Sequence, residues 1–138
     1  MTLTDAGALV ALLDKDQPQN ARCRNVFPSL SLPLLTTWSA FTEAMYLLYQ
    51  IGGWPLQAKL WQYVEEGILS LHSSNGVERQ RIRQLMEQYR DTPMDLADAS
   101  LVVTAETLNL IRIFTLDSDF YVYRIKGAEA FEVVPSRL

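Results

Sequence analysis

The chain has 138 residues, of which 49% are hydrophobic and 20% charged, a composition typical of a folded domain and not of a disordered segment. Its formal net charge of −4 argues against a general polyanion-binding protein, because such proteins are usually basic. No apolar run reaches the roughly 18 residues that a membrane span needs, no signal peptide is evident at the start, and a single cysteine, Cys23, fits a reducing compartment. We therefore expect a cytoplasmic protein without membrane attachment.

Short apolar strands alternate with helical stretches along the chain. We expect strands at residues 3–5, 34–36, 68–72, 111–115 and 131–134, with helices at 6–13, 18–27, 37–51, 56–66, 74–89 and 95–108. Such alternation indicates βαβ units, and hence a parallel sheet with right-handed crossovers. No repeat, linker or low-complexity stretch interrupts the pattern, so we expect residues 1–138 to form one three-layer α/β/α domain around five parallel strands.

The stretch Pro93–Ser100 ends a polar turn, opens an apolar helix and carries two carboxylates three residues apart. Asp95 is a good N-cap, because its side chain can accept hydrogen bonds from backbone N–H groups that otherwise lack partners. Asp98 falls near the third helical position, where the positive end of the helix dipole tolerates an anion. Helix initiation alone accounts for Asp95, whereas Asp98 belongs to a wider acidic pattern.

Four acidic residues far apart in sequence lie where a predicted strand ends or a helix begins: Asp5, Glu43, Asp98 and Asp117. In an open parallel sheet, the C-terminal ends of the strands and the N-termini of the helices share one edge, and that edge holds the site. A single acid at such a position is usually a cap or a surface charge. The joint placement of four predicts a cluster of carboxylates at one rim.

Clustered carboxylates raise one another's pKa and destabilise a fold unless a cation neutralises them. The predicted ligands are all oxygens, which favours a hard ion such as Mg²⁺ or Mn²⁺ over Zn²⁺. The chemistry suited to such a centre is hydrolysis of a phosphodiester. The chain has no GxxxxGK[ST] phosphate loop, which argues against an NTPase.

Four blocks of the sequence resemble those of a PIN-domain ribonuclease, in the style of the VapC-like toxins of bacterial type II toxin–antitoxin pairs. They are residues 5–13 (DAGALVALL), 42–43 (TE), 93–99 (PMDLADA) and 115–120 (TLDSDF). The resemblance implies a five-stranded parallel sheet and a Mg²⁺- or Mn²⁺-dependent enzyme that cuts RNA. It also implies a homodimer, and inhibition by an antitoxin whose tail fills the groove.

Carried over residue by residue, the resemblance implies that the catalytic, metal-binding quartet is Asp5, Glu43, Asp98 and Asp117. Asp119 lies near as a further acid, Asp95 lies beside the quartet, and Thr115 matches the small hydroxyl residue that supports the last aspartate. Ala6 departs from the pattern, because many relatives carry a hydroxyl residue there. That departure puts in doubt a local hydrogen bond and no metal ligand.

Other residues give weaker indications of partners. Arg124 and Lys126 follow the turn that carries Asp117 and Asp119 (the acidic turn) and are expected to contact RNA phosphates. A homodimer surface is expected from apolar and aromatic residues of two neighbouring helices, which are Tyr46, Tyr49, Gln50, Trp54, Leu56, Leu60 and Trp61.

Two other interpretations remain at this point. A receiver-like or phosphatase-like α/β protein also gathers aspartates around Mg²⁺. A receiver would have adjacent acids after the first strand and a phosphatase an Asp-x-Asp, whereas Asp5 stands alone and residue 7 is Gly. The second is a PIN fold that only binds and does not cleave, against which all four acidic positions are retained.

Overall fold

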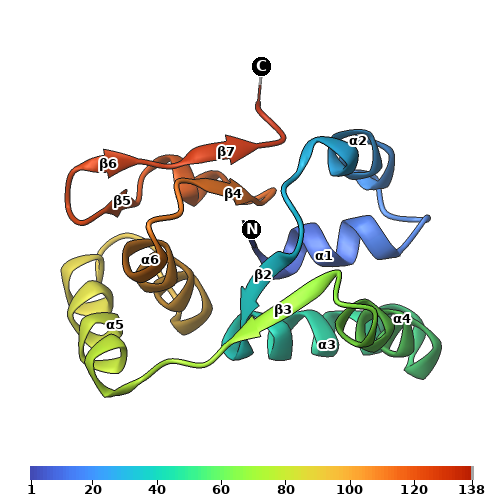
Figure 1. The fold of residues 1–138 in the computed structure, drawn as a ribbon, viewed down its shortest axis with the longest axis horizontal. Helices are drawn as coiled ribbons and strands as arrows, with labels where there is room; N and C mark the ends of the chain where they lie inside the picture. Colours follow the sequence, from blue (N-terminus) through green and yellow to red (C-terminus); the bar gives the residue numbers. More distant parts are fainter. Residues whose placement is uncertain (138) are drawn as a thin grey trace.

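Five strands form one parallel sheet in the order β3-β2-β1-β4-β7 in the computed structural model, which describes residues 1–137 (Figure 1). The strands are β1 (Thr2–Thr4), β2 (Leu34–Thr37), β3 (Leu69–His72), β4 (Arg112–Phe114) and β7 (Glu132–Val134). Every pairing between neighbours is parallel. The predicted five-stranded parallel sheet is confirmed.

Six α-helices connect or flank these strands: α1 (Ala6–Leu13), α2 (Asn20–Val26), α3 (Trp38–Gly52), α4 (Trp54–Glu65), α5 (Gly76–Gln88) and α6 (Leu96–Leu108). Two 3₁₀ turns, η1 (Phe27–Ser29) and η2 (Ser118–Tyr121), and a small antiparallel hairpin, β5 (Arg124–Ile125) with β6 (Glu129–Ala130), complete the chain. Within the described residues, no helix is both long enough and apolar enough to cross a bilayer.

Alternate residues of the central strands feed two separate cores, because successive side chains of a strand point to opposite faces. Leu35 and Ile113 pack with α5 and α6 on one face. Leu34 and Phe114, which are their neighbours in sequence, pack with α1, α3 and α4 on the other face. Figure 1 shows α5 beside α6 and α3 beside α4, so the sheet lies between two helical layers as predicted.

The sheet edge at which β1 and β4 end is where α1 and α6 begin. Asp5 follows β1 directly and caps α1, and Asp95 caps α6. The loop from Thr115 follows β4, the immediate neighbour of β1 in the sheet. The topology therefore brings together three segments that are more than a hundred residues apart at their extremes.

Candidate metal centre

Asp5 is held at the end of β1 by two hydrogen bonds that fix both of its carboxylate oxygens. Its Oδ1 accepts from the backbone N–H of Ala6 at 2.7 Å, and its Oδ2 accepts from the Thr115 hydroxyl at 2.9 Å. The residue is only 7% exposed. The carboxylate is therefore buried and oriented by its own fold.

Thr115 links the ends of β1 and β4. Besides donating to Asp5, its Oγ1 accepts from the backbone N–H of Asp117 at 3.0 Å. The Oδ1 of Asp117 in turn accepts from the backbone N–H of Asp119 at 2.9 Å and caps η2. One hydroxyl thus aligns Asp5 with the loop that carries Asp117.

Asp98 and Asp95 form a reciprocal capping box at the start of α6. The backbone N–H of Asp98 donates to Asp95 Oδ1 at 2.8 Å, and that of Asp95 donates to Asp98 Oδ2 at 3.4 Å. Asp98 is buried while Asp95 is exposed. The cap predicted for Asp95 is present, and it also aims the Asp98 side chain.

Tyr123 is a contact of the site that sequence patterns did not indicate. Its hydroxyl lies 3.0 Å from Asp98 Oδ2 and also contacts the carbonyl oxygen of Pro93. The ring is fully buried and packs edge-on against Tyr89 and Phe120, with ring centroids 5.3 and 5.1 Å away. In the sequence, Tyr123 is only a tyrosine that follows the acidic turn. Its partner Asp98 is 25 residues away, so the spacing did not indicate the contact.

Three of the four predicted acids converge. Asp5, Asp98 and Asp117 each offer a carboxylate oxygen, and these oxygens lie within 4.8 Å of one another. A cleft of about 350 Å³ is lined by two of them, Asp98 and Asp117, and also by Asp95 and Asp119. A cluster of three carboxylates with only oxygen donors fits a hard divalent cation such as Mg²⁺ or Mn²⁺.

The raised pKa values of two carboxylates in the cluster also favour the binding of a cation. Burial, and then the charges of Glu43 and Asp117, raise the pKa of Asp5 to about 6 despite the hydrogen bonds from Thr115 and Ala6. Burial, and then the charges of Asp95 and Asp5, raise the pKa of Asp98 to about 7. These carboxylates resist ionisation in the metal-free protein, and a bound cation would reverse that preference.

Glu43 and Asp119 lie around the cluster. Glu43, on α3, is exposed as a whole residue. Partial desolvation of its carboxyl group, followed by the charges of Asp95 and Asp117, raises its pKa. Burial and the neighbouring Asp117 raise the pKa of Asp119. Asp119 lines the cleft, and both residues lie close enough to Asp117 for its charge to act on them.

The two cations expected to contact RNA are placed differently from each other. Arg124 directs Nη1 to the backbone carbonyl oxygens of residues 121, 122 and 123, beside η2. Lys126 directs Nζ to Asn109 Oδ1 at 3.2 Å, beyond the C-terminal end of α6. Asp98 lies at the opposite end of that helix, about 16 Å away at 1.5 Å per residue. The structure does not bring Lys126 to the carboxylates.

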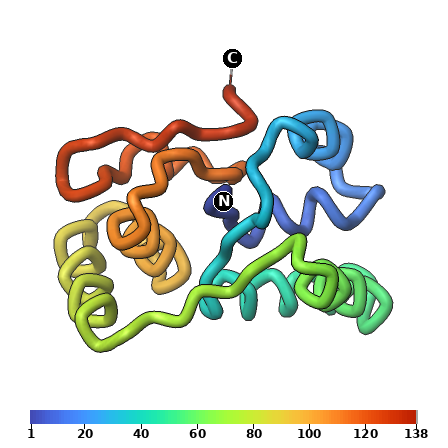
Figure 2. The backbone as a smooth tube through the Cα atoms, viewed as in Figure 1, coloured from blue at the N-terminus to red at the C-terminus, as the bar shows by residue number. Residues whose placement is uncertain are grey.

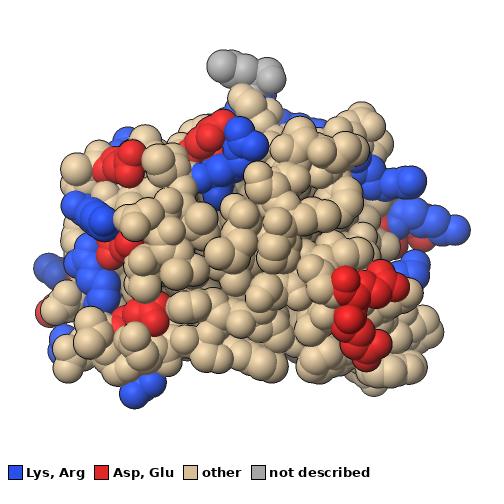
Figure 3. Space-filling view, in the orientation of Figure 1, with Lys and Arg blue, Asp and Glu red and all other residues tan. Residues whose placement is uncertain are grey.

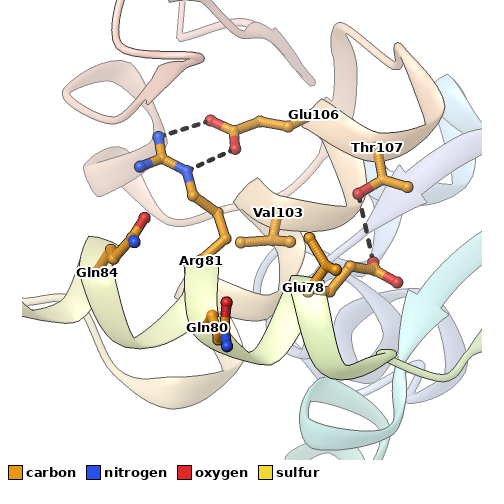
Figure 4. A pocket seen from close by; sticks show the side chains of 8 residues that line it. Glu78, Gln80, Arg81, Gln84, Val103, Glu106 and Thr107 are labelled. Atoms are coloured by element: carbon orange, nitrogen blue, oxygen red, sulfur yellow. Dashed lines mark hydrogen bonds and ion pairs between the residues drawn. The ribbon is translucent and has the colours of Figure 1, made fainter.

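A second hollow, of about 340 Å³, lies between α5 and α6 (Figure 4). Its charged side chains satisfy one another: Arg81 makes two hydrogen bonds to Glu106, and Glu78 accepts from His72 and Thr107. Figure 4 shows the Arg81 guanidinium turned toward Glu106. These groups join the two helices and leave no uncompensated charge for a ligand.

Comparison with known proteins identifies the family. The family model described as PIN domain matches residues 2–126. Ribonuclease VapC26 of Mycobacterium tuberculosis is 25% identical over 134 residues, which make up 96% of this chain and 99% of that protein.

Three solved structures share the fold. The crystal structure of Mycobacterium tuberculosis VapC20, a sarcin-ricin loop cleaving toxin, has a TM-score of 0.82 at 11% identity, covering 88% of this chain and 94% of that one. A toxin–antitoxin complex from Klebsiella pneumoniae gives 0.67 at 15% identity, covering 87% and 90% of the two chains. FitAcB from Neisseria gonorrhoeae gives 0.58 at 19% identity, covering 86% and 88%.

The receiver-like and phosphatase-like interpretations are thereby set aside, since neither has this family assignment. A match that runs from the first strand through the acidic turn, on a chain whose sheet order and carboxylate edge are as described, makes this protein a member of the PIN-domain family, similar to the VapC toxins.

Proposed function

We propose that this protein is a metal-dependent endoribonuclease, and the toxin of a type II toxin–antitoxin pair. The observation that carries the proposal is the convergence of Asp5, Asp98 and Asp117, whose carboxylate oxygens lie within 4.8 Å of one another at the edge of the sheet. The similarity to ribonuclease VapC26 over nearly the whole chain supports RNA as the substrate.

The chain's own residues have distinct tasks in this proposal. Asp5, Asp98 and Asp117 would hold Mg²⁺ or Mn²⁺, which when bound supplies charge stabilisation for the phosphate oxygens and activates water. Thr115 fixes the orientation of Asp5, and the backbone N–H of Asp95 fixes that of Asp98. Glu43 of α3 is close enough to Asp95 and Asp117 for their charges to raise its pKa, and in this proposal its carboxylate would complete the metal shell or accept a hydrogen bond from the attacking water.

Single-turnover cleavage of a labelled RNA pool tests this function. We expect Asp5→Ala and Asp98→Ala each to lower the rate by roughly a hundredfold or more, because each removes transition-state stabilisation worth several kcal/mol. The double variant should lose little more, since residues that act as one unit are not additive. Asp16→Ala, which removes an exposed acid on a distant turn, is the control of equal charge change.

Metal removal separates this function from that of a PIN fold that only binds. EDTA should abolish cleavage, and Mg²⁺ or Mn²⁺ should restore it. Cleavage that continues in EDTA, or in the Asp98→Ala protein, contradicts the proposed centre. RNA binding without any cleavage in either metal would favour the non-catalytic alternative.

The proposed partner is an antitoxin, as in the related toxin–antitoxin complex. An apolar groove of about 460 Å³ lies between α1 and α3, lined by Val10, Leu47 and Ile51 among others. Leu116 also lines it, and the next residue lines the acidic cleft. The groove therefore lies next to the cleft, and an apolar antitoxin segment bound in it could extend to the carboxylates. Ile51→Glu should weaken capture by the antitoxin encoded beside the gene, and unchanged capture would contradict this placement.

We also propose a homodimer built on an exposed aromatic face of α3 and α4. Tyr46, Tyr49 and Trp54 are 63%, 58% and 62% exposed, which is unusual for three neighbouring aromatic side chains. Two other residues expected on this surface are elsewhere: Leu60 is fully buried, and Leu56 packs against the core. Trp61 packs edge-on against Phe41, with ring centroids 5.1 Å apart, and is only partly available.

A further inference from the structure

Two arginines from opposite ends of the chain lie beside the Asp117 loop. Arg22 is on α2, Arg137 follows β7, and both line a hollow of about 30 Å³ together with Asp117 and Tyr121. Figure 2 shows the red C-terminal segment and the blue turns of α2 on the same side of the molecule. Lys and Arg side chains also gather over α2 and the turn before it in Figure 3.

Both arginines are tethered to this place. Arg22 Nη2 donates to the backbone carbonyl of Ser136, 114 residues away in sequence. The backbone N–H of Arg137 donates to the Tyr121 hydroxyl at 3.2 Å, and its guanidinium lies 4.9 Å from the centre of the Tyr121 ring. The hydrogen bond to Ser136 limits the conformations of the Arg22 side chain, and the cation–π contact limits those of the Arg137 side chain. Both side chains are otherwise exposed.

Neither guanidinium forms an ion pair with a carboxylate within residues 1–137. The four ion pairs there involve His72, Arg81, Arg83 and Arg112. An arginine has five N–H donors, and the hydrogen bonds described engage few of them. Two guanidinium groups with unused N–H donors are therefore available to bind an anion next to the acidic cleft.

The hollow and the acidic cleft are adjacent, because Asp117 lines both. A nucleic-acid strand with one phosphate at the carboxylates would bring a neighbouring phosphate close to this hollow if it runs toward α2. The cluster of acids would repel those phosphates, so a strand needs compensating cations close by. The volume of about 30 Å³ has room for roughly two water-sized groups, which suits phosphate oxygens and not a base.

We propose that Arg22 and Arg137 bind the phosphate of a nucleotide that flanks the cleaved bond. This inference rests on the proposed ribonuclease function. Arginine suits the task because its planar fork of donors matches phosphate oxygens in a bidentate way. The two side chains would bind the backbone of the strand, so they fix its register and carry no sequence information.

Equilibrium binding tests the pair without cleavage. Fluorescence anisotropy with a labelled single-stranded RNA in EDTA should show about tenfold weaker binding for the Arg22→Ala/Arg137→Ala protein. The slope of log K against log salt should become shallower by about 0.7 for each phosphate that the variant no longer binds. Arg22→Gln/Arg137→Gln keeps a donor for the Ser136 carbonyl and should give the same result if the alanine variant folds poorly.

Arg24→Ala is the matched control, because Arg24 is exposed on the same helix, two residues on, and lies near Tyr63. It should leave affinity and salt slope unchanged. In single-turnover cleavage with Mn²⁺, substitution of the arginine pair should raise the half-saturating RNA concentration and leave metal-induced thermal stabilisation as in wild type.

The outcomes distinguish this subsite from the proposed function. Wild-type affinity and salt slope in both arginine double variants overturn the subsite, even if cleavage depends on Asp98. A loss of RNA affinity in those variants without metal-dependent cleavage in wild type keeps the subsite and overturns the function. Displacement of RNA by a polyglutamate peptide of equal charge, at equal concentration and only when both arginines are present, would assign the surface to an acidic protein segment instead.

Discussion

At the residue scale, the site depends on hydrogen bonds that leave particular carboxylate oxygens free. Tyr123 and the backbone of Asp95 both approach Asp98 Oδ2. We therefore expect Oδ1 of Asp98 to be the oxygen that binds a metal. We therefore expect the Tyr123 hydroxyl to act as a positioning group, since it contacts Asp98, a proposed metal ligand.

Tyr123→Phe isolates that hydroxyl, because it keeps the buried ring and its packing. We expect Mn²⁺ affinity to fall by about tenfold, as for other partners that orient a metal ligand. Titration calorimetry with Mn²⁺ measures this directly. Tyr89→Phe is the control, since Tyr89 packs on the same ring but its hydroxyl accepts from the backbone of Arg124. Equal affinity in the Tyr123→Phe and wild-type proteins would remove Tyr123 from the site.

The pKa values of Asp5 and Asp98 give the metal-free protein an unusual pH dependence. Their pKa values are raised to about 6 and about 7 from an ordinary value of 3.8, so folding favours the protonated forms. That contribution to stability is complete below about pH 4 and is lost as the pH rises through about 7. Thermal unfolding in EDTA should therefore show a melting temperature that falls between about pH 5 and pH 8.

Metal should reverse this trend. Binding requires ionised carboxylates, so the rise in melting temperature on adding Mn²⁺ should be small at about pH 5 and large at about pH 8. Asp98→Asn should melt higher than wild type in EDTA and gain less from metal. A wild-type melting curve that Mn²⁺ leaves unmoved at about pH 8 would falsify the centre described above.

At the element scale, Glu106 joins three elements through one carboxylate. Oε1 accepts from Arg81 Nε of α5 at 2.9 Å, and Oε2 accepts from the backbone N–H of Lys126 in the β5–β6 hairpin at 2.6 Å. The Glu106 side chain is 11% exposed. Figure 4 shows its bidentate contact with Arg81 across the space between α5 and α6.

Glu106→Gln should lower the free energy of unfolding by about 2 kcal/mol, because it replaces charge-assisted bonds in a largely buried place. Urea unfolding monitored by circular dichroism gives the value. Glu87→Gln removes a solvent-exposed ion pair with Arg83 at 3.7 Å and should cost about 0.5 kcal/mol or less. An equal loss of unfolding free energy in the two variants would mean that Glu106 does not stabilise the contact among α5, α6 and the hairpin.

Local signals explain which element boundaries were predictable. The Asp95 cap and the β4 strand were evident, because both follow from residue types within a few positions. Helix α4 begins at Trp54 and not at residue 56, since Gly53 adopts a φ of +70° and Pro55 fits the first turn. Helix α2 begins at Asn20, because residues 14–17 and 17–20 close two successive turns.

Long-range contacts explain what the sequence did not reveal. The β5–β6 hairpin has strands of two residues, too short for any periodicity. Tyr123 meets Asp98, and Arg22 meets the C-terminal segment, only after the sheet has been assembled. The convergence of Asp5, Asp98 and Asp117 was predictable, because the C-terminal ends of parallel strands lie at one edge of the sheet. No comparable rule predicts that an arginine side chain will contact a backbone carbonyl far away in sequence.

At the scale of the whole molecule, the exposed aromatic face of α3 and α4 predicts self-association. Light scattering at micromolar concentration should give twice the 15.7 kDa mass of one chain. Tyr46→Ser/Trp54→Ser should shift the mass toward one chain without lowering stability, because both side chains are more than half exposed. Thr42→Ser, an exposed change on the same helix, is the control. A wild-type mass of one chain contradicts the dimer.

The three carboxylates that converge come from positions 5, 98 and 117. A chain still on the ribosome carries at most two of them until residue 117 has been added, and the strand that pairs with β4 on its outer side follows later still. The three carboxylates of the proposed centre can therefore come together only after residue 117 has been synthesised. A product that ends before residue 117 lacks one of the three carboxylates, and it should therefore lack the proposed cleavage activity.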